Sequence, residues 1–79
     1  MKIKSITMNV LVNLDEIQEV RKNNKEDSRT DMEIAKILAV HCVLDTELPF
    51  VSYLINYTST EYLSENQLMV IVGVQNSHA

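Results

Sequence analysis

The stretch that most constrains the fold of this chain runs from Thr30 to Thr46 and is apolar on nearly every side. Thr30 followed three residues later by Glu33 is typical of a capping box, in which each side chain satisfies a backbone donor of the first turn. We therefore predict a main helix over about residues 31–45, although the short branched run 37–44 is also compatible with a strand. The apolar stripe of this helix has the spacing expected for a buried element, and its members are Ile34, Ile37, Leu38 and His41, widened by Ala35, Ala39, Cys42 and Val43. Such a helix has to be covered on most sides.

Three further segments have the patterns of strands. Residues 4–14 alternate apolar and polar side chains, and only Leu11 breaks the alternation, as in a half-buried strand. Pro49 cannot continue the main helix, so a second strand is expected from Phe50 to about Thr58. Residues 67–75 are apolar on both faces and predict the third strand.

The segment between the first strand and the main helix is mostly polar. Asn13, followed three residues later by Glu16, favours a short helix over residues 14–21, but this segment could instead continue the strand. Residues 21–29 contain no apolar side chain, so we predict a solvated, mobile loop there.

The order strand, helix, strand, strand predicts an α+β fold. We expect residues 1–79 to form a single two-layer β-α-β-β domain, with the main helix packed on a mostly antiparallel three-stranded sheet. A parallel pairing of the first and third strands would need a right-handed crossover. Because one principal helix covers one side of a sheet, the other side is expected to expose a large apolar patch, formed by Met69, Ile71 and part of Val51, Tyr53, Ile55 and Tyr57.

Charge and composition exclude several classes of partner. The net charge is −4, and residues 31–79 contain one base, Lys36, against six acids. Phosphate binding needs clustered Lys and Arg, so direct binding of nucleic acid is not expected. No apolar run approaches the roughly 18 residues of a membrane span. A lone cysteine, Cys42, indicates a reduced setting, and we expect a cytoplasmic protein.

No motif predicts an active site, a cofactor or a metal. His41 and Cys42 are adjacent, so on a helix they point about 100° apart and cannot converge on one metal or form a nucleophilic pair. We expect His41 to be buried and hydrogen-bonded to a backbone carbonyl. Gly73 is the only glycine, which excludes a glycine-rich phosphate loop and predicts a bulge or a close backbone approach within the third strand.

The four aromatic residues are clustered within 13 positions, from Phe50 to Tyr62. Tyrosine is favoured at interfaces because it combines a rigid apolar ring with a hydroxyl. We assign Phe50 to the core and predict that the tyrosines and the apolar residues of the outer sheet face contact another protein, namely Tyr53, Ile55, Tyr57, Tyr62, Met69 and Ile71.

These features favour a small, acidic, non-enzymatic interaction module. We expect it to self-associate, with a dimer favoured, and to bind or inhibit a protein partner whose identity the sequence does not give. One alternative is a small-molecule-binding oligomer, in which tyrosines at subunit boundaries stack on a planar ligand. An enzyme would require an active site assembled between subunits.

A second alternative is an acidic mimic of nucleic acid acting on a nucleic-acid-binding protein. The strand-helix-hairpin order, opening with Met1-Lys2-Ile3 and closing with residues 68–73, loosely resembles the damage-inducible inhibitor of recombinase filaments. That family ends in an acidic helix, which this sequence lacks after Gln75, so the resemblance covers topology and not a motif. The acids that would imitate phosphates are Asp31, Glu33, Asp45, Glu47, Glu61 and Glu65.

Overall fold

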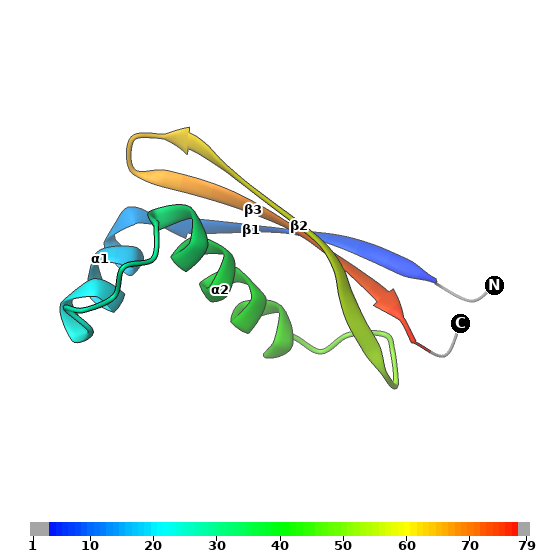
Figure 1. Cartoon of the computed structure of the whole chain (residues 1–79). Helices are drawn as coiled ribbons and strands as arrows, with labels where there is room; N and C mark the ends of the chain where they lie inside the picture. Colours follow the sequence, from blue (N-terminus) through cyan, green and yellow to red (C-terminus); the bar gives the residue numbers. More distant parts are fainter. Residues whose placement is uncertain (1–3, 78–79) are drawn as a thin grey trace.

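The computed structural model describes residues 4–77 and contains three strands and two helices (Figure 1). Along the chain they are β1 (Ser5–Asn13), α1 (Leu14–Asn23), α2 (Asp31–Leu44), β2 (Tyr53–Ser64) and β3 (Gln67–Asn76). The strands form one sheet in the order β1-β3-β2, and both pairs are antiparallel. The predicted α+β fold is therefore confirmed, and no parallel crossover is needed.

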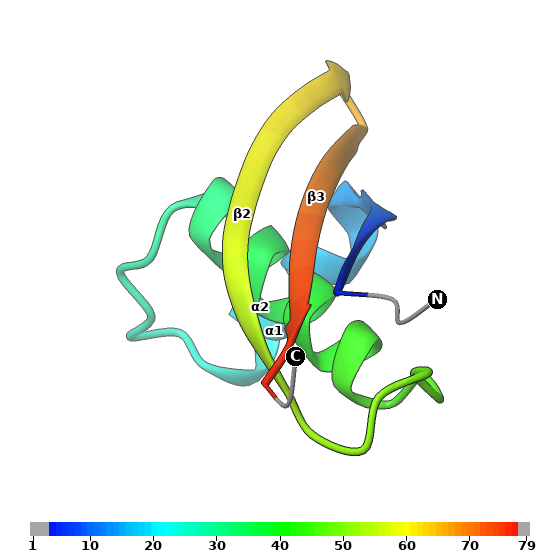
Figure 2. The ribbon, with the colours of Figure 1, turned by 90° about the vertical axis from the view of Figure 1, so that its right-hand side faces the viewer.

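The molecule has two layers. Both helices lie on the same side of the sheet, below the strands in Figure 1, and no described element covers the other side. Figure 2 shows β2 and β3 running side by side as a long twisted hairpin, with the helices behind them. We call the uncovered side of the sheet the open face.

The core lies between the central strand and the helices. β3 contributes every second side chain to it, because alternate residues of a strand point to opposite sides. These side chains meet the buried side of α2 and one residue from each of β1 and α1. The fully buried set is Val12, Ile17, Ile34, Ala35, Ala39, Val43, Leu68, Val70, Val72 and Val74.

α2 begins close to the predicted position. Thr30 Oγ1 accepts a hydrogen bond from the backbone N–H of Glu33 at 3.2 Å, which confirms the cap. The second half of the predicted capping box is wrong, since Glu33 Oε1 accepts from the Thr30 hydroxyl and not from a backbone N–H. Ala35 and Ala39 are buried, and their small side chains let the helix lie close to the sheet.

The prediction that His41 is buried is wrong, because its side chain is exposed. His41 is two residues beyond the buried Ala39, so it lies about 200° away around the helix axis and points away from the sheet. The outer side of α2 remains uncovered, with Met32 38% and Leu44 50% exposed. One copy of the chain therefore does not supply the cover that we expected for this helix.

α1 confirms the helical interpretation of residues 14–21. It starts after Asn13, whose backbone N–H donates to Glu16 Oε2 at 2.9 Å, and it buries Ile17. The helix extends to Asn23, so the first part of the predicted loop 21–29 is helical. Arg21, at the end of α1, donates to Asp31 Oδ1 at 2.7 Å and thus ties α1 to the start of α2.

Candidate protein-interaction surface

The register of the strands defines the open face. Val70, Val72 and Val74 of β3 point into the core, so their neighbours in sequence, such as Met69 and Ile71, point to the opposite side. Residues paired directly across an antiparallel sheet share a face. The open face therefore consists of Ser5, Thr7, Asn9, Leu11 and Asn13 of β1, Gln67, Met69, Ile71, Gly73 and Gln75 of β3, and Leu54, Asn56, Tyr57, Ser59, Glu61 and Ser64 of β2.

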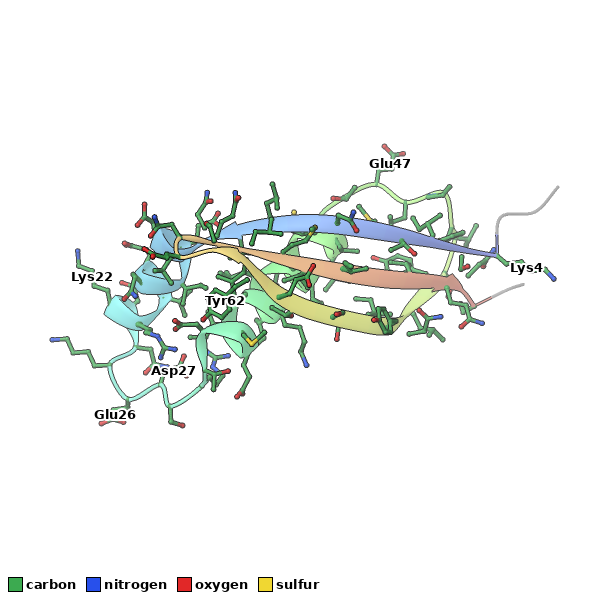
Figure 3. All side chains as sticks on the ribbon, turned by 90° about the horizontal axis from the view of Figure 1, so that it is seen from above. Lys4, Lys22, Glu26, Asp27, Glu47 and Tyr62 are labelled. Carbon is green, nitrogen blue, oxygen red and sulfur yellow. The ribbon has the colours of Figure 1, made fainter. Side chains whose placement is uncertain are left out.

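This face is nearly free of charge. Among its 16 positions, Glu61 is the only residue of the Asp, Glu, Lys and Arg class, although these charged residues form 23% of the chain. Figure 3 looks onto the open face, and the charged residues labelled there lie off the strands: Lys4 before the start of β1, Lys22 on α1 and Glu47 in the loop after α2. A solvated sheet face commonly carries charged side chains, so the composition of this one is unusual for a surface in water.

Five apolar residues lie on the open face and come from all three strands. Leu11 is 54%, Leu54 47% and Tyr57 57% exposed, while Met69 and Ile71 are half-buried between their neighbours on the outer strands. Leu11 pairs directly with Met69 across β1 and β3. The apolar side chains thus extend across the width of the sheet, and the remaining positions carry Ser, Thr, Asn and Gln together with Gly73 and Glu61.

An irregularity in β2 decides where the tyrosines point. The pairing with β3 shifts between Ile55 and Tyr57, so Asn56 is an extra residue in β2. Ile55 and Tyr53, before the shift, pack against the core on the helix side. Tyr57, after the shift, pairs with Gly73 and lies on the open face. Without the bulge, Tyr57 would share the face of Ile55.

Gly73 is required by this bulge. A Cβ at Gly73 would point to the open face, where it would lie 2.8 Å from Asn56 Oδ1 and 3.0 Å from Tyr57 Cβ. Asn56 Nδ2 also donates to Gln75 Oε1 at 3.1 Å, so the amide is held over the strand. The predicted close backbone approach at Gly73 is confirmed.

The six predicted interaction residues do not form one surface. Tyr57, Met69 and Ile71 lie together on the open face. Tyr53 and Ile55 lie on the opposite side, packed against the core. Tyr62 pairs with the buried Leu68 and so also belongs to the helix side, where it is 51% exposed. Phe50 packs against the core, as predicted.

Sequence reasoning missed two members of the open face, Leu11 and Leu54. Leu11 was visible as the one apolar residue at a polar position of the first strand, and this break in alternation is the signal that could have found it. Leu54 had no such signal, because the residues around it are apolar on both sides of β2. Both side chains are about half exposed.

The described residues contain no group of three or more His, Cys, Asp or Glu placed to hold a metal ion. Cys42 is exposed, as is the adjacent His41. Asp27 lies in the loop before α2. Hydrogen bonds from the side chain and the backbone N–H of Arg29 lower the pKa of Asp27 to about 2. The Asp27–Arg29 ion pair stabilises the loop between α1 and α2, on the helix side of the molecule.

Comparisons with protein-family models, with curated proteins and with solved structures found no match for this chain. In the part of the chain that the structure describes, neither helix is long and apolar enough to cross a membrane.

Proposed function

We propose that the chain is a non-enzymatic protein-interaction module that self-associates through the open face of its sheet. The observation that carries this proposal is the exposure of Leu11, Leu54 and Tyr57 on a face with one charge in 16 positions. Exposed apolar side chains gathered on a face with so little charge are typical of contacts with another protein. The half-buried Met69 and Ile71 form the centre of the contact.

The low charge of the open face permits a second copy of the chain as its occupant. Two molecules with a net charge of −4 repel each other in most orientations. When open faces meet, the only carboxylates brought into the contact are the two copies of Glu61. Glu61 lies on β2, at one margin of the sheet, so it can remain hydrated at the rim of the contact. The uncharged polar residues can exchange hydrogen bonds without burying a charge.

The tyrosine arrangement gives no support to a planar-ligand site. Tyr57 lies on the open face, whereas Tyr53 and Tyr62 lie on the helix side, so the three rings do not line one boundary. The face is instead suited to a contact with another sheet face, in which Tyr57 supplies the largest exposed side chain. In this proposal the self-associated form of the chain binds or inhibits a further protein partner.

Sedimentation equilibrium at micromolar concentration tests the proposal. We expect an assembly whose mass is at least halved by Ile71→Asp, because this substitution places a charge at the centre of the contact. Gln18→Asp, an exposed position on α1, introduces the same side chain on the other side of the molecule and should leave the mass unchanged. Circular dichroism of both variants serves to check that they fold.

A second, milder variant tests the proposal if Ile71→Asp does not fold. Tyr57→Ala removes an exposed ring without adding charge, and interface tyrosines of this kind contribute about 1–2 kcal/mol or more to association. We expect at least a tenfold weaker association, which corresponds to about 1.4 kcal/mol. A wild-type chain that sediments as a monomer at tens of micromolar, or an assembly indifferent to both variants, would overturn the proposal.

A further inference from the structure

The free edge of β1 differs from the free edge of β2. β1 pairs with β3 over Ser5–Asn13 without a register shift, and this range contains no charged residue and no proline. β2 is interrupted twice, between Ile55 and Tyr57 and between Tyr62 and Ser64. Bulges, prolines and charges are the devices that protect sheet edges from pairing with other chains. β1 has none of these devices.

The hydrogen bonds at the two ends of β1 show which backbone groups are free. Lys4 O accepts from Asn76 N at 2.9 Å, and Leu14 N donates to Asn66 O at 2.8 Å. In an antiparallel pair, both backbone groups of a residue point to the same neighbour and successive residues alternate. The even-numbered residues of β1 therefore bond to β3, and the odd-numbered residues direct their N–H and C=O away from the sheet.

Four consecutive odd-numbered residues, Ser5, Thr7, Asn9 and Leu11, thus present unpaired backbone groups along the edge. The fifth, Asn13, already donates its N–H to Glu16 Oε2. No described strand pairs with this edge, because β1 is the last strand in the order β1-β3-β2. The loop between α2 and β2 lies on the helix side, below β1 in Figure 1, and Figure 3 shows that Glu47 in this loop extends outward past β1.

We propose that β1 of a second copy pairs antiparallel with this edge, about a two-fold axis through Met8. In this register Ser5 pairs with Leu11 of the second copy, and Thr7 with Asn9 of the second copy. Each such pair exchanges two hydrogen bonds. The four residues on each copy are all used, and Asn13 keeps its bond to Glu16. By symmetry a second copy presents the same four residues, so both edges are used over equal lengths.

The pairing also fits the side chains. On the helix side, Ile6 would lie opposite Val10 of the second copy, and Met8 opposite itself. All three are half-buried and already pack against the core. The two-fold axis is perpendicular to the sheet, so both pairs of helices stay on the same side, and the two open faces merge into one.

This inference rests on the proposed function, because pairing at β1 supplies the contact area that association through the open faces needs. Over the nine residues of β1, about 30 Å, three strands spaced about 4.8 Å apart present a footprint of roughly 400 Å². A stable interface buries about 800 Å² on each partner. Pairing at β1 gives a six-stranded sheet with twice the footprint, and two such sheets stacked by their open faces form a tetramer with two kinds of contact.

Disulfide trapping tests the register directly. In a Cys42→Ser background, Thr7→Cys and Asn9→Cys chains are prepared separately and then mixed under mild oxidation. A directly opposed pair has Cα atoms about 5.5 Å apart, which suits a disulfide, whereas two copies of residue 9 would be more than about 7 Å apart. We expect rapid formation of the mixed dimer and little of either homodimer. Absence of the mixed disulfide, or equal yields of all three products, would overturn the proposed register.

Sedimentation separates this inference from the proposed function. Asn9→Pro removes an outward N–H while leaving the bonds between β1 and β3 in place, as prolines on edge strands do. We expect it to halve the mass of the wild-type assembly, and Ile71→Asp to halve it through the other contact. If the proposed function alone is wrong, the wild type is a dimer that Ile71→Asp leaves intact and Asn9→Pro dissociates. If the edge contact is wrong, folded Asn9→Pro keeps the wild-type mass. If Asn9→Pro does not fold, the disulfide yields decide.

Discussion

Oδ1 of Asn56 lies 2.8 Å from the point where a Cβ on Gly73 would be, and this contact joins the bulge of β2 to the central strand. Gly73→Ala should therefore destabilise the domain. Asn56 can turn away only by giving up its bond to Gln75, and Tyr57 Cβ, at 3.0 Å, is fixed by the backbone. Overpacking typically costs about 1–3 kcal/mol, and the entropy gained by removing a strand glycine offsets about 0.5–1. We expect a net loss of about 1 kcal/mol in urea unfolding.

A double-mutant cycle isolates the contact. In an Asn56→Ala background, Gly73→Ala no longer meets the amide oxygen, so its destabilising effect should be smaller than in the wild type. Residues in contact generally show such coupling, of about 0.5 kcal/mol or more. Equal effects of Gly73→Ala in both backgrounds would contradict the geometry of the bulge.

Leu68 and Leu63 offer a matched comparison of burial. Leu68 is fully buried on β3, and Leu63 is 48% exposed at the end of β2. Leu68→Ala leaves a cavity and should lower the free energy of unfolding by about 3 kcal/mol, as buried leucines do. Leu63→Ala should lower it by less than about 1 kcal/mol, because half of the side chain is already hydrated. Thermal unfolding followed by circular dichroism measures both, and a similar loss for the two variants would contradict the assigned core.

Local pattern was sufficient to predict most of the fold. The alternation of the first strand, the cap at Thr30 and the break at Pro49 each depend on a few neighbouring residues, and each placed the start of an element within a few positions. The predicted end of the second strand, at about Thr58, is wrong, because β2 continues to Ser64. The buried side of the main helix was harder to predict, because α2 is apolar nearly all round. The side that faces the sheet is the one whose small side chains let the helix approach closely. Ala35 and Ala39 therefore lie on this side, and His41 does not.

The candidate surface was predictable only in part. Strict alternation from Val51 to Tyr57 puts Tyr53, Ile55 and Tyr57 on one face, and a single extra residue at Asn56 moves Tyr57 to the other. A bulge in β2 depends on its partner strand, through the glycine at position 73. Sequence alone located that glycine and interpreted it as a bulge or a close approach, but it did not show which residue of the other strand would be displaced.

The cap of α2 predicts a measurable effect at Thr30. Thr30→Ala removes the oxygen that accepts from the backbone N–H of Glu33, and loss of an N-cap typically costs about 1 kcal/mol. Thr30→Ser retains the hydroxyl and should remain close to the wild type. Urea unfolding of the three proteins gives the comparison. A serine variant as unstable as the alanine variant would show that the methyl group, and not the hydrogen bond, stabilises this turn.

Asp27 and Arg29 predict how stability depends on pH. The Asp27 side chain is only 3% exposed, and it accepts hydrogen bonds from Arg29 Nε at 2.8 Å and from the Arg29 backbone N–H at 3.0 Å. These bonds lower its pKa from 3.8 to about 2. Because the folded form holds its proton less tightly than the unfolded form, the carboxylate stabilises the fold above pH 3.8, and this contribution is lost as the pH falls through 2.

Asp27→Asn should therefore be less stable than the wild type at pH 7, with a difference that shrinks between about pH 4 and pH 2 as the wild-type carboxyl takes up its proton. Glu26→Gln is the matched control, since Glu26 is exposed and points outward from the same loop in Figure 3, where Asp27 lies on the inner side. It removes one negative charge next to the same residues and should leave the dependence on pH unchanged. Chemical unfolding at a series of pH values measures the difference for both variants. The difference in free energy of unfolding between Asp27→Asn and the wild type could instead stay constant down to pH 2. That result would mean that Arg29 stabilises the loop without the charge of Asp27.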